Sequence, residues 1–273
     1  MVHIAIPEPT SPEFVPDSAA YNQRSLPQYL HALISAGATP IPIPLHESPQ
    51  RVARILATCH GICLPGSPAD IDPQTYGQAQ NGSEPPDPAR AAVDELLLQD
   101  AFNLHKPILA ICQGMQALNT WRNGTLIQDI PTQIGSLVNH APGREVTEAH
   151  PIQITPNTRL AAIHQTIRVA PVSIPSPGSD AHPNEHLPEY INSSHHQSVQ
   201  TPGDNLLISA ISPQDRVIEA IELHSADHFV LAVQWHPERS YNQSAFSRAI
   251  FHAFVHAAQS WTPRKIEESV LHA

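Results

Sequence analysis

The stretch that most constrains the fold is KPILAICQGMQALN, residues 106–119. Residues 108–111 are all apolar and suit a buried parallel strand, because both faces of such a strand are hydrophobic. Cys112 ends this run, and apolar residues beyond Gly114 recur at helical spacing. Strand, sharp turn and helix are the shape of a nucleophile elbow, where the helix dipole and free N–H groups favour a thiolate. A lone cysteine at a strand end is more often a small buried residue, so the catalytic reading requires a base from elsewhere.

Length and charge limit the class of protein. A chain of 273 residues can form one large α/β domain or two small ones. Its formal net charge of -11 predicts neither nucleic acid nor an anionic membrane as partner, and favours small neutral or zwitterionic molecules. The sequence holds no apolar span of about 18 residues and does not open like a secretory signal. Its 3 cysteines do not make a disulfide framework, so we expect a reducing cytoplasm.

Strand and helix patterns alternate along the chain, as in a parallel α/β sheet. The expected strands are 2–6, an edge strand at 41–45, 61–64, 108–111, 151–154, 206–211, 217–223 and 229–235. The expected helices are 21–36, 51–59, 88–104, the helix after Cys112, a short turn at 160–163 and a covering helix at 244–261. Asp94, Glu95 and Asp100 are expected to be solvated helix charges. The proline-rich residues 171–188 predict a surface loop or lid rather than a linker between domains.

Two further stretches carry polar groups, and each can be interpreted either as functional or as structural. The strand at 61–64 runs into a turn at Gly66 and Ser67, whose N–H groups either face a substrate oxygen or simply end the strand. Cys59, His60 and Cys63 precede or lie in that strand and are interpreted as packing residues rather than metal ligands.

The segment 189–199 holds His195, His196 and Gln197. Adjacent histidines on a strand point in opposite directions, and no carboxylate follows at a suitable spacing, so a substrate-binding loop is favoured over a metal site.

The missing base is predicted after the strand at 229–235, which ends in His236, Pro237 and Glu238. A strand-end histidine can accept the thiol proton, and a glutamate two residues later can hold its other ring nitrogen. Either residue alone is ordinarily structural. Together with Cys112 and Gly114, each placed after an apolar strand, they predict a catalytic set.

Four motifs then resemble a known family: LPGSPADIDPQTYG, AICQGMQALN, NSSHHQSV and AVQWHPE. In this order they are similar to the class I glutamine amidotransferases and, within them, to the gamma-glutamyl-gamma-aminobutyrate hydrolases of the peptidase C26 group. The resemblance covers nearly the whole chain. It implies a flavodoxin-like three-layer α/β sandwich with a mostly parallel central sheet and a nucleophile elbow, in one domain over residues 1–273.

The resemblance also implies roles for individual residues. Cys112 matches the nucleophile, His236 the general base and Glu238 the residue that orients it. The implied oxyanion donors are main-chain N–H groups of Gly66 or Ser67 and of Gln113. The implied substrate contacts are Gln116, His195, His196 and Gln197. No metal or organic cofactor is expected, and a homodimer is what the family suggests.

Two positions depart from the family pattern. Gln113 stands where the family usually has arginine, and Asn123 with Gly124 stands where it has a glycine pair. Because the oxyanion donor is a main-chain N–H, Gln113 should preserve that function. Loss of the arginine charge is expected to act on substrate choice or on a structural ion pair.

The predicted function is hydrolysis of the gamma-glutamyl amide bond of a small gamma-glutamyl amine, such as gamma-glutamyl-gamma-aminobutyrate, through a cysteine thioester. Three alternatives stay open. They are a glutaminase subunit that feeds ammonia to a separate synthetase, a gamma-glutamyl hydrolase or transferase of a specialised pathway, and an inactive homologue that binds without catalysis.

Overall fold

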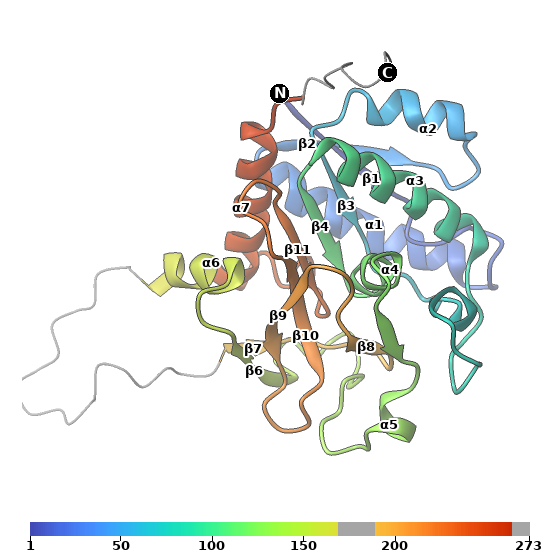
Figure 1. The fold of residues 1–273 in the computed structure, drawn as a ribbon, viewed down its shortest axis with the longest axis vertical. Coiled ribbons are helices and arrows are strands. Elements are labelled where there is room, and N and C mark those ends of the chain that lie inside the picture. Colours follow the sequence, from blue (N-terminus) through green and yellow to red (C-terminus); the bar gives the residue numbers. More distant parts are fainter. Residues whose placement is uncertain (169–188, 264–273) are drawn as a thin grey trace, which may run out of the picture.

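A mixed β-sheet runs through the middle of the molecule (Figure 1). The computed structural model describes residues 1–168 and 189–263. Its strands are β1 (Val2–Pro7), β2 (Ala38–Ile43), β3 (Gly61–Leu64), β4 (Ile108–Ile111), β5 (Thr125–Ile127), β6 (His150–Ile154), β7 (Glu189–Ile191), β8 (Ser198–Thr201), β9 (Leu206–Ile211), β10 (Ile218–Leu223) and β11 (Val230–Val233).

The sheet has a parallel part and an antiparallel part. Its order through the described residues is β2-β1-β3-β4-β11-β10-β9-β6-β7, with β8 pairing both β5 and β10. The neighbours from β2 to β11 pair in parallel. From β11 onward every pair is antiparallel. The carboxyl ends of the parallel strands therefore meet at one edge, and the antiparallel strands extend the sheet beside them.

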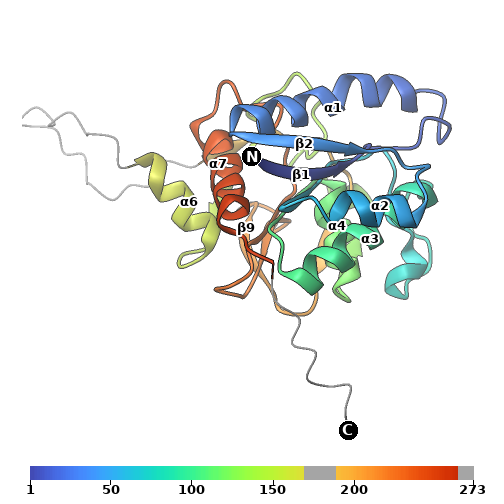
Figure 2. The same cartoon turned by 90° about the horizontal axis from the view of Figure 1, so that it is seen from above.

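Helices cover both faces of the parallel part. The helices of the described residues are α1 (Ser18–Ser35), α2 (Pro49–Leu56), α3 (Pro88–Leu104), α4 (Gln113–Trp121), α5 (Ile130–Gln133), α6 (Arg159–Arg168) and α7 (Ala245–Ser260), with a 3₁₀ helix at Pro73–Tyr76. Figure 2 shows α1 on one side of the sheet and α2, α3 and α4 on the other. In the described ranges, no helix is both long and apolar enough to cross a bilayer.

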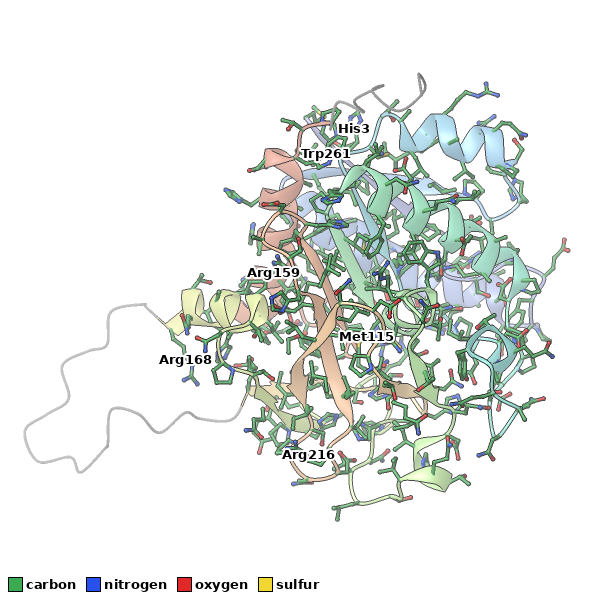
Figure 3. All side chains as sticks on the ribbon, in the orientation of Figure 1. His3, Met115, Arg159, Arg168, Arg216 and Trp261 are labelled. Carbon is green, nitrogen blue, oxygen red and sulfur yellow. The ribbon has the colours of Figure 1, made fainter. Side chains whose placement is uncertain are left out.

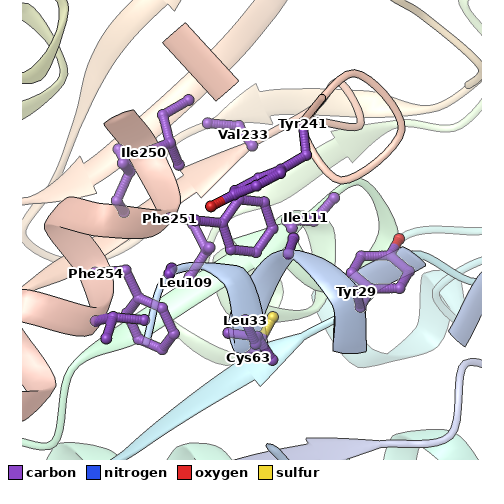
Figure 4. Packing of buried hydrophobic residues seen from close by; sticks show 14 of the residues in the cluster. Tyr29, Leu33, Cys63, Leu109, Ile111, Val233, Tyr241, Ile250, Phe251 and Phe254 are labelled. Atoms are coloured by element: carbon purple, nitrogen blue, oxygen red, sulfur yellow. The ribbon is translucent and has the colours of Figure 1, made fainter. Parts of the chain in front are cut away.

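Strand β4 shows how the sequence divides the core between these layers. Leu109 and Ile111 pack with α1 and α7, whereas Ile108 and Ala110 pack with α2, α3 and α4. Successive side chains of a strand point to opposite faces, so a run that is apolar at every position is buried on both. Figure 4 shows Leu109 and Ile111 among aromatic and aliphatic side chains of the first layer.

The fold class predicted from the sequence is confirmed, because helices flank a sheet whose central strands are parallel. The elements at 61–64, 88–104 and 108–111 have the predicted bounds, and β2 is an edge strand as predicted. The helical turn expected at 160–163 is part of the longer α6, because Leu160 and Ile163 bury one face of that helix. The loop or lid predicted at 171–188 lies outside the described residues.

Candidate active site

The nucleophile elbow forms at Cys112, between β4 and α4. Cys112 has a positive φ of 55° with ψ -111°, a conformation that non-glycine residues rarely adopt and that tight functional turns hold. Its N–H donates to the carbonyl of Val233 at 2.8 Å, so β11 fixes the turn. A Cβ on Gly114 would overlap the carbonyl oxygen of Leu64, so only glycine fits there. Met115, labelled in Figure 3, is fully buried and begins the helix face that packs on the sheet.

The imidazole of His236 lies after β11 and is held on two sides. Its Nδ1 lies 2.8 Å from Oε1 of Glu238, so the Nδ1–H donates to that carboxylate and Nε2 keeps its lone pair. The Asn192 side chain accepts from His236 N at 2.9 Å and donates to His236 O at 2.8 Å. Asn192 is thus a positioning residue that the sequence reasoning missed, because its only local signal is a polar residue just after a short strand.

The thiol and the imidazole meet at Gly66. A Cβ placed on Gly66 would lie 2.9 Å from Cε1 of His236, 3.2 Å from Oη of Tyr29 and 3.3 Å from Cβ of Cys112. These three side chains come from β11, α1 and β4 and pack against one glycine. The turn therefore needs glycine because no side chain fits between the catalytic groups. The structure brings Cys112, His236, Glu238 and Gly66 together in one buried cluster, which we call the catalytic cluster.

A buried arginine holds the Gly66 turn through the carbonyl of the preceding residue. Arg90 of α3 donates to the carbonyl of Pro65 and to that of Pro9, each at 2.7 Å. Its Nε donates to Asp94 at 2.8 Å, and both side chains are buried. The prediction that Asp94 is a solvated helix charge is therefore wrong. Helical spacing alone does not reveal that this face of α3 turns toward two loop carbonyls.

The oxyanion donors predicted at the elbow and the turn are placed as follows. The N–H of Gln113 points at the sulfur of Cys112, where it lowers the pKa of the thiol. The N–H of Gly66 donates to Oη of Tyr29 at 3.0 Å. Ser67 Oγ accepts from Ala69 N at 3.1 Å, which shapes the turn that carries the Ser67 N–H. The assignment of oxyanion donors stays a prediction.

Burial dominates the electrostatics of the thiol. It raises the pKa of Cys112 to about 12, although Arg239 and the N–H of Gln113 act in the opposite direction. Burial also lowers the pKa of His236, with Arg239 acting in the same direction. Burial therefore opposes the thiolate that the helix start favours, because a side chain that is only 6% exposed loses its hydration. A neutral thiol beside a neutral imidazole requires proton transfer during attack.

The residues predicted to contact substrate form two groups. Gln116 Nε2 donates to the carbonyl of Gln197 at 3.1 Å, and His196 lies 3.2 Å from Asp70 with a partly exposed ring. These contacts link α4, the 3₁₀ region and the loop before β8. Their role in substrate binding stays a prediction.

His195 belongs to a different set of side chains. Its ring lies with His140, His150 and Glu219 in a buried group, which we call the histidine cluster, whose ligand atoms all lie within 4.8 Å of one another. Within the described ranges this is the one group of its kind, and Cys59, His60 and Cys63 do not form another. Burial lowers the pKa of His195 to about 4, so its ring is neutral.

A hollow of about 380 Å³ lies beside Asn192, Trp235 and Ser240. None of the three catalytic side chains lines it. This hollow therefore does not mark the catalytic cluster.

Comparison with known proteins places the chain among related sequences. The sequence model of the family described as Peptidase C26 matches residues 4–238. A putative glutamine amidotransferase of Mycobacterium tuberculosis is 34% identical over 239 residues, which cover 87% of this chain and 68% of that protein. The gamma-glutamyl-gamma-aminobutyrate hydrolase PuuD of Escherichia coli (strain K12) is 31% identical over 244 residues, which cover 85% of each.

Among solved structures, a putative GMP synthase component from Thermoplasma acidophilum matches with a TM-score of 0.59. The match covers 96% of each chain at 14% identity, so it supports the fold alone.

Proposed function

Because the chain belongs to the Peptidase C26 family, we propose that it hydrolyses the gamma-glutamyl amide bond of a small gamma-glutamyl amine through a thioester on Cys112. Family and relatives make it a hydrolase that acts on amide bonds, of gamma-glutamyl hydrolase or amidotransferase-like type. The observation that carries the proposal is the buried hydrogen bond of 2.8 Å between His236 and Glu238, packed on the same glycine as Cys112.

In the first half of the reaction, Nε2 of His236 accepts the thiol proton while Sγ of Cys112 bonds to the gamma-carbonyl carbon. The carbonyl oxygen becomes an oxyanion and accepts hydrogen bonds from main-chain N–H groups at Gln113 and the Gly66 turn. The carbon–nitrogen bond then breaks, and His236 returns the proton to the departing amine. Glu238 stabilises the imidazolium that forms between these two steps.

In the second half, His236 accepts a proton from water as the water oxygen attacks the thioester. The carbon–sulfur bond breaks, the thiol regains its proton from the imidazolium, and glutamate leaves. The same imidazole serves both halves because Glu238 and Asn192 keep it in one orientation.

The side chain of Arg239 favours a substrate that carries a carboxylate. Its Nε is buried and makes no hydrogen bond to any described residue, although it lies 3.7 Å from Oε1 of Glu238. Its charge also lowers the pKa of Cys112. We infer that a substrate carboxylate pairs with Arg239, because guanidinium groups bind carboxylates in two-point fashion.

A glutaminase that supplies ammonia to a separate synthetase is the second candidate. It is favoured by the 34% identical relative, which is named as a putative glutamine amidotransferase. The two functions differ in the leaving group, because a glutaminase releases ammonia and a gamma-glutamyl amine hydrolase releases a larger amine.

The experiment is a panel of gamma-glutamyl amines that includes gamma-glutamyl-gamma-aminobutyrate, other amines and glutamine. Glutamate release is measured, and intact-protein mass spectrometry after rapid quenching follows a glutamyl adduct. We expect turnover of an amine substrate and an adduct that maps to Cys112 and disappears in Cys112→Ala but not in Cys59→Ala. Turnover of glutamine alone, together with copurification of a synthetase, would favour the second candidate. Absence of any adduct and any turnover would contradict both.

A further inference from the structure

The histidine cluster presents four electron-pair donors to one point. Nδ1 of His140, Nε2 of His150 and Nε2 of His195 lie 3.2, 3.5 and 3.7 Å from Oε1 of Glu219. All four side chains are at most 4% exposed. Nε2 of His150, Nε2 of His195 and Oε2 of Glu219 make no hydrogen bond to any described residue, and Nδ1 of His140 faces Oε1 of Glu219 across 3.2 Å. Buried polar atoms are nearly always paired, so a group of this kind calls for a ligand.

In each ring we call the nitrogen that faces Glu219 the inner nitrogen and the other the outer nitrogen. When the ring is neutral and the outer nitrogen carries the hydrogen, the inner nitrogen has a free lone pair. Nε2 of His140 lies 2.9 Å from a carboxylate oxygen of Asp215. Nδ1 of His150 lies 3.2 Å from the carbonyl of Pro151, and Nδ1 of His195 lies 2.8 Å from that of Gln197. Carboxylate and carbonyl oxygens only accept, so in each ring the outer nitrogen carries the hydrogen. This is the arrangement in which metal-bound histidines are held.

A single extra proton does not satisfy the group. It would join one ring nitrogen to one oxygen of Glu219 and leave two more nitrogens facing the carboxylate without a donor. A divalent metal ion can accept an electron pair from each of the four residues at once. With bonds of about 2.0–2.2 Å, the ligands of a tetrahedral zinc ion lie about 3.3–3.6 Å apart. The three nitrogen–oxygen separations are close to this range, and all four ligand atoms lie within 4.8 Å of one another.

We propose that His140, His150, His195 and Glu219 bind one zinc ion. Imidazole nitrogen with one carboxylate oxygen is a ligand set for zinc rather than for calcium or magnesium, which prefer oxygen. Four protein ligands and no exposed face leave no position for water or substrate, so the ion is structural. The proposal is independent of the reaction at Cys112 and differs from the sequence-based expectation that no metal is needed.

The ion would join segments that are far apart in the chain. His140 lies between α5 and β6, His150 begins β6, His195 lies between β7 and β8, and Glu219 lies on β10. The loop with His195 also carries Asn192, which holds the backbone of His236. The carbonyl of Glu219 accepts from Gln234 N at 2.8 Å. The ion would therefore brace the loop that positions the catalytic imidazole.

The first measurement is the metal content of the full chain, purified without a histidine tag and dialysed extensively. Mass spectrometry with an inductively coupled plasma should find close to one zinc ion per chain. Protein stripped by a chelator should regain one equivalent of zinc, with a rise in Tm of about 5–10 °C. Cobalt(II) in place of zinc should give the intense visible absorption of a four-coordinate ion. Absence of zinc as purified, together with no uptake of zinc or cobalt, would overturn the proposal.

Variants locate the ion. His150→Gln and Glu219→Gln should lose the bound zinc and the zinc-dependent rise in Tm. The matched control is His164→Gln, because His164 also pairs with a carboxylate, that of Glu189 at 3.1 Å, but lies outside the cluster. It should keep one zinc ion per chain. If His150→Gln folds and still binds one equivalent of zinc, the ion lies elsewhere and the proposal fails; if it does not fold, the cobalt spectrum of the unmodified chain decides.

Discussion

The catalytic cluster and the histidine cluster belong to one sheet, in which β11 leads to His236 and its neighbour β10 carries Glu219. The two clusters match their hydrogen-bond donors and acceptors differently. In the catalytic cluster, the Nδ1–H of His236 donates to Glu238, and the N–H of Gln113 faces the sulfur of Cys112. In the histidine cluster, three ring nitrogens face one carboxylate, and two of these nitrogens have no hydrogen-bond partner among the described residues. The first arrangement suits a proton that moves between groups, and the second suits a cation that stays.

Their positions in the sheet differ as well. The catalytic side chains follow the carboxyl ends of the parallel strands β4 and β11, where an α/β sheet gathers its functional groups. The histidine cluster draws on the antiparallel strands β6 and β10 and on two loops. The catalytic cluster is therefore built at the ends of strands, and the histidine cluster joins two strands and two loops. Substitutions should separate them, with activity lost at the first and metal lost at the second.

The largest effect is expected for Cys112→Ala. It removes the nucleophile, so kcat for gamma-glutamyl amides should fall by about 10⁴-fold or more. The zinc content and Tm should stay near those of the unmodified chain, because a small side chain is replaced by another. Steady-state assays and thermal unfolding test both parts, with Cys59→Ala as a control that should remain active. Substantial residual turnover in Cys112→Ala would break the assignment of the nucleophile.

Arg90→Met should destabilise the protein by about 3–5 kcal/mol, because it leaves the carboxylate of Asp94 buried without its partner. The activity of the folded fraction should fall too, since Pro65 loses the guanidinium that holds the Gly66 turn. Chemical denaturation measures the loss, and Arg90→Met with Asp94→Leu should recover part of it. A loss below about 1 kcal/mol would show that the pair does not support the turn.

Glu238→Gln should lower kcat by about 100-fold while leaving zinc bound. The amide still accepts a hydrogen bond from His236, but it cannot stabilise the imidazolium by charge. Measurement of kcat together with metal content distinguishes this from a general loss of structure. An effect on zinc content equal to the effect on kcat would mean that the two clusters are not separate.

The pH profile sharpens the same contrast. Burial and Arg239 lower the pKa of His236 below its ordinary value of 6.5, so its imidazole is the neutral base at neutral pH. Activity should therefore be flat around pH 7 and fall only as the pH drops below about 6.5 through the lowered pKa. Glu238→Gln removes an interaction that raises this pKa, so the acid limb should move to still lower pH. A limb above pH 7 would contradict this account.

The sequence pointed to the residues of the catalytic cluster as one set, whereas it did not point to the histidine cluster as a set. Cys112 and His236 each follow a run of apolar residues, and the end of such a run in the sequence indicates where the buried strand ends. The histidine cluster has no such local pattern, because Glu219 is 24 residues from His195 and sits in a strand that is buried at every position. The sequence argument against a metal considered only carboxylates at nearby positions, and Glu219 is not one of them.

The same limit explains Arg90 and Tyr29. Both lie on helices whose periodicity predicts a buried face, but not which loop carbonyl or ring nitrogen that face meets. Tyr29 of α1 is fully buried in the layer drawn in Figure 4. Its Oη lies 3.0 Å from Gly66 N and 3.4 Å from Nδ1 of His236. A tyrosine at this spacing is ordinarily a core residue. Tyr29 packs in the core and its hydroxyl also contacts the Gly66 turn and the ring of His236.

The smallest effect is expected for Tyr29→Phe. It keeps the ring in the core and removes one hydroxyl, so Gly66 N loses a partner at a cost of about 1 kcal/mol in the free energy of unfolding. Because that hydroxyl also lies beside the catalytic imidazole, kcat should fall by about three- to tenfold with little change in KM. Tyr241→Phe is the matched control: this tyrosine packs against Phe251 in the same layer and should cost stability without lowering kcat. Equal kcat values for the two variants would mean that Tyr29 acts through packing alone, and that the catalytic cluster ends at Gly66.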